Sequence, residues 1–449
     1  MTTLLIEELS YCSDSALLFD RLRDLDQPVF LDSSAPYCKR GRFDLISAEP
    51  RKTISTNQAI SDVYDAKLNF FDNLKDALSD LDGSIENNFK LPFIGGAIGY
   101  FGYDLGRQLE QIPTTAKHDR TLADAIAGIY SWAIICDHHN HRSLLVAHPR
   151  TSRSLLNDIR SRLTDRQPQL STPFKLHRSF QADISQQQYR DAFAQVQDYI
   201  LSGDCYQINL AQRFSSTFSG DPWAAYLKLR PVTAAPFSAY LQFHNQAILS
   251  MSPERFLQSD RNTVNTAPIK GTIARGNNAE QDHALAQQLL NSEKDRAENL
   301  MIVDLLRNDL GKACLPGSIK VDELFELQSF ETVHHLVSTI SGTLKPDTHP
   351  LDLLAGSFPG GSITGAPKIR AMQIIEELEP SRRSAYCGSI GYISCDGHMD
   401  TNIAIRTLVC ENETIDCWAG GGIVADSQWQ SEYQECLTKV GKLLAALEE

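Results

Sequence analysis

Lys270 lies in a largely apolar stretch of the chain, residues 265–272, directly before a Gly-Thr pair. Apolar surroundings disfavour the charged ammonium group, so they lower the pKa of a lysine and make its neutral amine available as a nucleophile. A strand lysine whose amine reaches water fits the same residues. The stretch leaves covalent catalysis and a plain structural lysine both open.

Glu298 interrupts the apolar face of a helix that the spacing predicts over residues 280–310, because apolar residues follow it three, four and seven positions later. A carboxylate on such a face is costly unless it is paired, protonated or bound to a metal ion. A salt bridge to Lys294 or Arg296 and ligation of a hard cation such as Mg²⁺ both satisfy its charge.

The last predicted helix, residues 428–447, carries two glutamates and two lysines on one face: Glu432, Glu435, Lys439 and Lys442. Glutamates and lysines three or four positions apart attract one another on an exposed helix. By themselves these four residues indicate a solvated face.

Two glycine-rich segments offer backbone amides to an anion. Residues 359–368 precede a predicted helix and look like a phosphate-binding loop, but Ala-Pro separates Gly365 from Lys368 and no Ser or Thr follows the lysine. Those departures exclude an ATPase of that type. Residues 419–424 are predicted to form a loop after a strand, where bare amides suit a carboxylate. Either segment alone is also typical of a plain turn.

The composition is that of an ordinary globular protein, with 449 residues, 42% hydrophobic residues and a formal net charge of −14. The acidic balance argues against nucleic-acid and anionic-membrane partners, which select basic patches. The chain shows no apolar run of membrane-spanning length and no signal peptide, so we expect a cytosolic protein. The cysteines form no Cys-x-x-Cys pair, and none lies in the Gly-x-Cys-x-Gly turn of a glutaminase nucleophile.

Helical and strand patterns mix along the chain without a regular rhythm. Further helices are predicted over residues 185–202 and 367–378, and strands over residues 206–214, 333–344, 387–395, 401–410 and 414–419. This mixture predicts an α+β protein with large mixed or antiparallel sheets packed as a sandwich and helices on the outside. Polar residues 151–180 indicate a linker between an N-terminal region, residues 1–165, and a C-terminal region, residues 180–449.

Taken together, several runs of residues resemble the chorismate-utilising enzymes and occur in that family's order. The runs are residues 268–272, 295–309, 358–368, 388–392, 404–407 and 419–427, with residues 42–44, 48–50 and 95–107 in the N-terminal region. The resemblance covers essentially the whole chain. It implies a fold like that of anthranilate synthase component I.

Two positions discriminate within this family. Members that add water to the chorismate ring carry a lysine where this chain has Gln207, and an amide cannot serve as that base. Anthranilate synthases carry alanine where this chain has Lys270. The resemblance therefore implies amination of chorismate at C4, toward 4-aminobenzoate and folate, with Lys270 as a covalent nucleophile. The alternatives are an anthranilate synthase component and a non-catalytic subunit that binds tryptophan or chorismate.

The resemblance also implies roles for individual residues. Glu254, which alone reads as a strand-end glutamate, matches the acid that protonates the leaving hydroxyl, and His335 and Ser362 match other catalytic positions. Glu298 and Glu435 match the ligands of Mg²⁺, the implied cofactor. The residues expected to contact the substrate are Gln207, Gly271, Thr272, Tyr392, Arg406, Gly420, Gly421, Gly422 and Lys439.

Two further features follow from the resemblance. Glutamine-dependent members take ammonia from a glutaminase subunit or domain, and the missing nucleophile turn implies a separate glutaminase partner for this chain. Anthranilate synthases also hold a tryptophan pocket. The matching residues here are Ser33, Arg42, Phe43, Pro236, Phe237 and Ser238. The loop at residues 235–240 departs from the family's Asn-Pro-Ser-Pro-Tyr pattern, which leaves a regulatory use of the pocket open.

Overall fold

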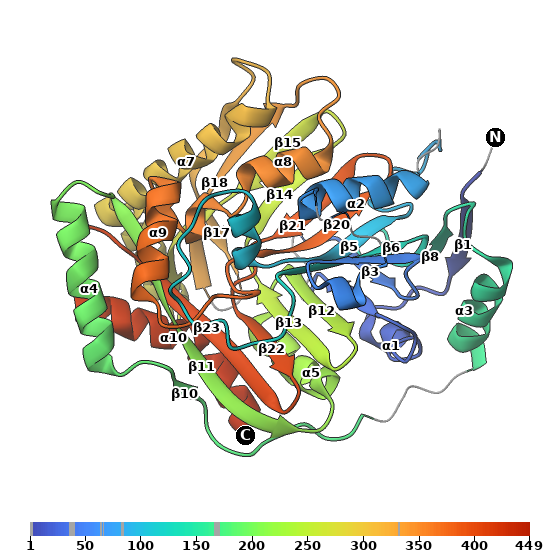
Figure 1. Ribbon diagram of the computed structural model, residues 1–449, viewed down its shortest axis with the longest axis horizontal. Helices are drawn as coiled ribbons and strands as arrows, with labels where there is room; N and C mark the ends of the chain where they lie inside the picture. Colours follow the sequence, from blue (N-terminus) through green and yellow to red (C-terminus); the bar gives the residue numbers. More distant parts are fainter. Residues whose placement is uncertain are drawn as a thin grey trace.

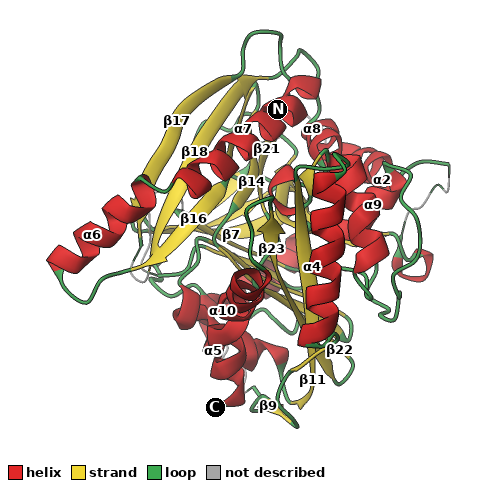
Figure 2. Cartoon of the chain, turned by 90° about the vertical axis from the view of Figure 1, so that its left-hand side faces the viewer, coloured by secondary structure: helices red, strands yellow, loops and turns green. Residues whose placement is uncertain are grey.

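The computed structural model describes residues 3–35, 41–62, 65, 67–81, 85–165, 171–330 and 333–449. Within these residues the chain forms two large sheets whose neighbouring strands run antiparallel, with helices around them (Figures 1 and 2). The α+β architecture predicted from the sequence is confirmed.

The first sheet has 13 strands in the described part of the chain. In spatial order its main path is β1 (Leu5–Leu9), β8 (Arg142–Ala147), β7 (Trp132–Asp137), β3 (Phe43–Ser47), β2 (Val29–Asp32), β12 (Phe237–Phe243), β13 (Gln246–Ser252), β22 (Thr407–Glu411), β23 (Thr414–Ile423), β11 (Gln207–Ser219) and β10 (Gln181–Ala182), and β19 (Gly365–Ala366) and β9 (Lys175–Leu176) also pair with β11.

The second sheet has 10 strands among the described residues. Its path is β16 (Ile269–Ala274), β18 (Val333–Thr343), β15 (Thr263–Ala267), β14 (Arg255–Asp260), β21 (His398–Asn402), β20 (Ser389–Ser394), β5 (Gly96–Phe101), β6 (Ala125–Tyr130) and β4 (Lys52–Ser55), and β17 (Lys320–Ser329) pairs with β18.

Helices cover the outer faces and ends of these sheets (Figure 2). They are α1 (Ala16–Phe19), α2 (Phe70–Leu78), α3 (Arg153–Asp165), α4 (Gln186–Leu201), α5 (Pro222–Thr233), α6 (Ala279–Leu290), α7 (Glu293–Ala313), α8 (Pro350–Ser357), α9 (Lys368–Leu378) and α10 (Trp429–Glu448), with short 3₁₀ turns that include η4 (Gly361–Ile363).

Strand β12 shows how the sequence divides its side chains between two apolar cores. Ala239 and Leu241 belong to the core shared by both sheets, whereas Tyr240 lies in a second core beneath the first sheet. There Tyr240 packs against Trp223 and Tyr226 of α5. Side chains that alternate along a strand point to opposite faces, so both faces of this central strand are buried.

Two predicted elements differ from the structure. The helix predicted over residues 280–310 is two helices, α6 and α7, because the Ser292 side chain accepts a hydrogen bond from the amide of Asp295 and caps a new N-terminus. The strand predicted over residues 401–410 is divided between β21 and β22, and at Arg406 the intervening backbone has a left-handed φ of +50°.

The predicted N-terminal and C-terminal regions contribute to both sheets. Strand β2 pairs with β12 in the first sheet, and β5 pairs with β20 in the second. The division of the chain near residues 165–180 stays a prediction, while the pairings show that strands on either side of it share each sheet.

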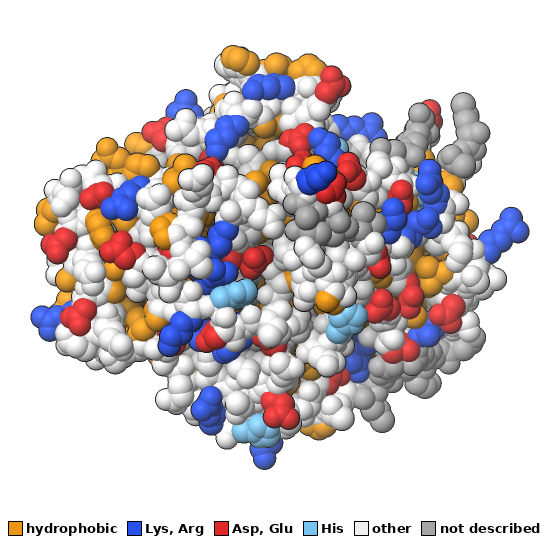
Figure 3. All heavy atoms as spheres, in the orientation of Figure 1, with side chains coloured by type: hydrophobic (Ala, Val, Ile, Leu, Met, Phe, Trp, Pro, Cys, Tyr) orange, Lys and Arg blue, Asp and Glu red, His pale blue; other side chains and the backbone are white. Residues whose placement is uncertain are grey.

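The surface carries acidic and basic side chains close together on the face that Figure 3 draws. Among the described residues, no helix is both long enough and apolar enough to cross a membrane.

Candidate active site

Ser362 joins Lys270 to Glu254. The Nζ of Lys270, on β16, donates to the backbone oxygen of Ser362 at 3.1 Å. The Oγ of the same serine, in η4, donates to Oε1 of Glu254 at 2.9 Å. Glu254 and Ser362 are both buried, at 6% and 5% exposure. Three residues predicted to be catalytic thus meet, although they come from three separate segments.

Burial sets the protonation of this pair. Desolvation lowers the pKa of Lys270, against the opposing influence of Glu254 and Glu298. Desolvation raises the pKa of Glu254, against the influence of Lys270 and of the Ser362 hydroxyl. Both shifts favour uncharged forms, a free amine beside a protonated carboxyl group. Such a pair provides a nucleophile and an acid in one site.

A bulge in β16 directs this part of the strand. The register against β18 shifts between Ile269 and Thr272, and Gly271 has a φ of +85°. A Cβ at Gly271 would lie 3.0 Å from Leu289 and 3.1 Å from Asp295. Glycine is therefore favoured there by its backbone conformation, and a side chain would crowd Leu289 and Asp295.

Acidic groups from α7 and α10 lie beside this pair. Lys294 Nζ is 3.8 Å from Glu298 and 3.4 Å from Glu432, so it partly neutralises both. Arg296, the other partner considered for Glu298, stacks instead over Phe325, at 5.0 Å from the ring centroid. Desolvation raises the pKa of Glu298, against the influence of Lys270 and Lys294, so this carboxylate is under-compensated.

Glu435 has a different environment. It pairs with Lys439 at 2.9 Å. Its side chain is exposed, and although partial desolvation raises its pKa, Lys439 and then Lys294 outweigh that effect, so the net pKa is lowered. The described residues contain no group of three or more His, Cys, Asp or Glu side chains placed to hold a metal ion. Glu298 and Glu435 offer hard oxygen ligands, and Mg²⁺ commonly uses one or two carboxylates and completes its shell with water and substrate. The residues therefore fit Mg²⁺.

The solvated face predicted on the last helix holds for Glu435, Lys439 and Lys442, which are exposed, but not for Glu432. Its exposed fraction is 2%, and its Oε1 accepts from the hydroxyl of Ser427 at 2.7 Å. The sequence carries a signal for this burial, because Cys436 and Val440 follow at four-residue spacing and are buried too. Glu432 therefore joins the acidic residues of this site, although the lysines that share its helix face indicated exposure.

The glycines at 420–422 lie within strand β23 and not in a loop after it, which corrects the predicted element. A Cβ at Gly421 would lie 3.2 Å from Oε2 of Glu432, and one at Gly422 would lie 2.5 Å from Nε2 of Gln207. The backbone oxygen of Gly420 accepts from Nζ of Lys439 at 2.9 Å. Missing side chains thus let polar groups of α10 and β11 approach this strand closely.

Gln207, at the start of β11, is fully buried, yet among the described residues neither its Nε2 nor its Oε1 finds a hydrogen-bond partner. Leaving a buried amide without partners is costly. A bound polar molecule would supply those partners. The contact between Gln207 and substrate stays a prediction.

His335 and Arg406 form another part of the site. Nδ1 of His335 hydrogen-bonds to Oγ1 of Thr272 at 2.8 Å. Burial, followed by the charge of Arg406, lowers the pKa of His335 to about 3, so the imidazole is neutral near pH 7. Burial also lowers the pKa of Arg406. A desolvated guanidinium of this kind suits a carboxylate ligand.

Lys368 serves the fold. Its Nζ donates to Asp309 at 2.7 Å and to the backbone oxygen of Ser357 at 2.9 Å. These bonds hold the segment of residues 359–368 against α7 and α8. This glycine-rich segment therefore carries Ser362 into the site and uses its lysine as an anchor.

Among the described residues, no hydrogen bond or ring contact joins Tyr392 to Lys270. Tyr392 lines a cavity of about 1180 Å³, and its ring packs against that of Phe93 with 5.9 Å between the ring centroids. The same cavity is lined by all of the residues predicted for a tryptophan pocket, namely Ser33, Arg42, Phe43, Pro236, Phe237 and Ser238. Whether Tyr392 contacts the substrate stays a prediction.

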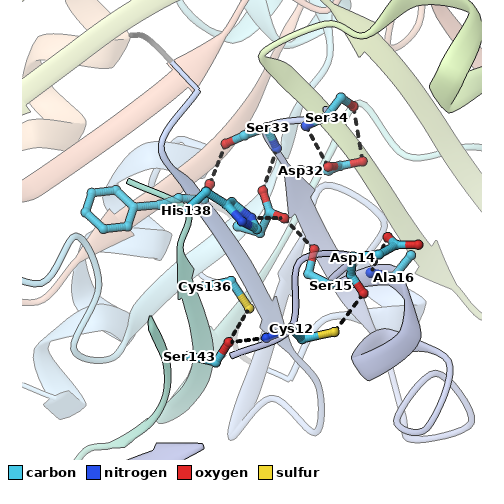
Figure 4. A network of polar contacts seen from close by, with 12 residues as sticks. Cys12, Asp14, Ser15, Ala16, Asp32, Ser33, Ser34, Cys136, His138 and Ser143 are labelled. Carbon is cyan, nitrogen blue, oxygen red and sulfur yellow. Dashed lines mark hydrogen bonds and ion pairs between the residues drawn. The ribbon is translucent and has the colours of Figure 1, made fainter. Parts of the chain in front are cut away.

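A buried polar network holds one wall of that cavity (Figure 4). The carboxylate of Asp44 accepts from the amide of Ser33 at 2.7 Å, contacts Nε2 of His138 at 2.7 Å and accepts from the hydroxyl of Ser15. Because Ser33 lines the cavity, this network fixes part of its lining before any ligand arrives. Whether tryptophan binds there stays a prediction.

Comparison with known proteins identifies the family. Residues 27–445 match the protein family described as "chorismate binding enzyme". The chain is 48% identical over 440 residues to aminodeoxychorismate synthase component 1 of Escherichia coli (strain K12), with 96% of this chain and 95% of that protein covered. It is 37% identical to anthranilate synthase component 1 of Thermus thermophilus, with 95% and 96% covered.

A solved structure agrees with this assignment. The crystal structure of anthranilate synthase component I from Streptococcus pneumoniae TIGR4 has a TM-score of 0.78 and 32% sequence identity, with 90% of this chain and 92% of that chain covered. The chain belongs to the chorismate binding enzymes, and the resemblance in its sequence motifs is confirmed.

Proposed function

We propose that this chain is the chorismate-aminating component of an aminodeoxychorismate synthase, which converts chorismate and ammonia to 4-amino-4-deoxychorismate. The observation that carries the proposal is the desolvated Lys270 held through Ser362 beside the protonatable Glu254. The 48% identity to a relative named for this activity supports it.

Each residue of the pair has a role in a double displacement. The neutral amine of Lys270 attacks C2 of chorismate, the ring double bonds shift, and the C4 hydroxyl leaves as water with a proton from Glu254. Ammonia then attacks C4, the double bonds shift back and the bond from C2 to Lys270 breaks. The new ammonium group on C4 then gives a proton to the carboxylate of Glu254, so that Lys270 is again a free amine and Glu254 is again protonated. Neutral His335, held by Thr272, offers a further hydrogen bond at the reacting ring.

Glu298 and Glu435 would hold Mg²⁺, which supplies positive charge for the ring carboxylate when bound. Arg406 and the amides of β23 suit the other carboxylate of chorismate, and Gln207 gains the partners it lacks. The absence of a Gly-x-Cys-x-Gly turn from the sequence supports a separate glutaminase as the ammonia source. The cytosol is the compartment we propose.

Anthranilate synthase is the second candidate, because the Thermus thermophilus relative carries that name at 37% identity. That reaction aminates C2 and expels pyruvate, whereas the proposed reaction aminates C4 and keeps the enolpyruvyl group. A non-catalytic binding subunit would need neither the nucleophile nor the acid.

Product chromatography distinguishes these functions. The purified chain is incubated with chorismate, ammonium and Mg²⁺, and the products are separated and identified by mass. A 4-amino product that retains the enolpyruvyl group is expected. Anthranilate as the main product would establish the second candidate, and unchanged chorismate would leave only the binding subunit.

A further inference from the structure

Arg383 is an almost completely buried cation, with an exposed fraction of 1%, that lies outside the set of residues with a proposed chemical role. It pairs with Glu379, also buried, through Nε to Oε2 at 2.9 Å and Nη2 to Oε1 at 2.7 Å. The rings of Tyr103 and Tyr386 flank the guanidinium at 4.7 Å and 5.9 Å. A charge pair this deep is costly to bury, so the contacts of its remaining donors indicate what it does.

The remaining donors of Arg383 reach two backbone oxygens. Nη1 donates to Ile363 at 2.9 Å, and Nη2 donates to Asn209 of β11. Asn209 also contacts the turn directly. Its side-chain Nδ2 donates to the backbone oxygen of Ile363 at 2.9 Å, and its backbone N–H donates to the backbone oxygen of Thr364 at 2.9 Å. One guanidinium thereby ties turn η4 to the strand beside it.

Ile363 follows directly after the residue that contacts both reacting groups. The carbonyl of Ser362 holds the amine of Lys270, and its hydroxyl holds Glu254. We propose that Arg383 is a positioning residue, which clamps the Ile363 carbonyl to β11 and so keeps Ser362 between the nucleophile and the acid. This inference rests on the proposed function, because it assigns Arg383 a role in the alignment of that pair.

The planar shape of arginine is what this position uses. Its fork serves Glu379, Ile363 and Asn209 at once, whereas lysine has one nitrogen at the end of a flexible stem. Arg383→Lys keeps the charge and loses most of the clamp. Loss of a residue that orients a reacting group commonly lowers activity by about 10–100-fold. We expect kcat to fall in that range with KM for chorismate within about threefold of wild type, since Arg383 itself is outside the proposed substrate contacts.

A double-mutant cycle with Ser362→Ala tests whether Arg383 acts through Ser362. Ser362→Ala removes the hydroxyl contact to Glu254, and its effect on kcat with ammonium is measured in the wild-type and Arg383→Lys backgrounds. If Arg383 positions Ser362, the alanine substitution costs less than about twofold in the Arg383→Lys background although it costs more in the wild type. Independent effects that multiply across the two backgrounds would overturn the inference.

Folding is checked by urea unfolding of every variant. If Arg383→Lys does not fold, the cycle is repeated on Arg383→Met/Glu379→Gln, which leaves no unpaired buried charge. The matched control is Arg120→Met, because Arg120 also makes a two-point pair with a buried acid, Asp416, but none of its described hydrogen bonds or ion pairs reaches η4. We expect the fold-changes in kcat caused by Arg120→Met and by Ser362→Ala to multiply in the double variant. If the wild-type enzyme forms no C4-amination product, the proposed function fails. If the enzyme is active and the effects of Arg383→Lys and Ser362→Ala on kcat multiply, only the role of Arg383 is overturned.

Discussion

The backbone oxygen of Ser362 accepts a hydrogen bond from the amine of Lys270 at 3.1 Å, so the residue that restrains the nucleophile belongs to a turn 92 positions away in sequence. A carbonyl acceptor leaves the lone pair of a neutral amine unoccupied, because the amine contributes only one of its N–H groups to this bond. The lone pair stays available for attack on carbon while the side chain is held in place.

Ser362→Ala is predicted to move the pH profile of kcat to higher pH. The Ser362 hydroxyl stabilises the charged form of Glu254 and lowers its pKa, so its removal raises that pKa. Lys270 and Glu254 share one proton in the active form, and both limbs of the profile report on the pair. Because the pKa of Glu254 is higher in the variant, the acid limb does not shift to lower pH and the alkaline limb shifts to higher pH. The profile is measured with saturating chorismate and ammonium. An alkaline limb that moves to lower pH would contradict the assigned contact.

The sequence predicted the helices and strands that carry the site better than the contacts between them. Lys270 and Glu298 could be recognised because a charged residue stands among apolar neighbours in each case. The contact between Gly422 and Gln207 could not, because the pairing of β11 with β23 alone brings these residues together. Arg383 carried no local signal either, since its acceptor Asn209 lies 174 positions earlier. The cavity that Tyr392 lines carried no local signal either, because a strand position does not reveal what its side chain faces.

Glu298→Gln is predicted to abolish Mg²⁺-dependent turnover and leave the fold intact. The carboxylate is desolvated and its pKa is raised, so neutralising it removes a cost of folding while it removes a metal ligand. In the wild type, Mg²⁺ at 100 times its dissociation constant should raise the free energy of unfolding by about 2.7 kcal/mol. In Glu298→Gln that increment should be lost or much smaller. Urea unfolding with and without Mg²⁺ measures it independently of activity.

The control for this experiment is Glu323→Gln on β17, an exposed glutamate in a different part of the second sheet. It should keep both the activity and the increment from Mg²⁺. Wild-type activity that persists in an excess of chelator would remove the metal assignment.

The isolated chain is predicted to use ammonium and not glutamine. It has no cysteine in a glutaminase turn, and most of its described cysteines are buried, with burial raising the pKa of the Cys387 thiol to about 12. A thiol of that pKa is protonated near pH 7 and is a poor nucleophile. Product formation is measured with each nitrogen source in turn. Glutamine-dependent product from the pure chain would refute this prediction, and activity restored by an added glutaminase would support the partner.

Lys270→Ala is predicted to lower C4 amination by at least about 100-fold, because it removes the group that forms the covalent intermediate. Direct attack of ammonia at C2 stays possible in the variant and would give the amination pattern of anthranilate synthase at a low rate. Lys270→Arg should be no more active, since a guanidinium stays charged and cannot attack carbon.

Mass spectrometry provides the direct measurement: the wild type quenched with chorismate and Mg²⁺, without ammonia, should carry a chorismate-derived adduct on Lys270. Lys439→Ala is the comparison, because Lys439 lies in the same site and is engaged by Glu435 and the Gly420 carbonyl. It should keep the adduct even if turnover slows. Unchanged C4 amination in Lys270→Ala would show that this lysine only positions the substrate, and the covalent mechanism would be wrong.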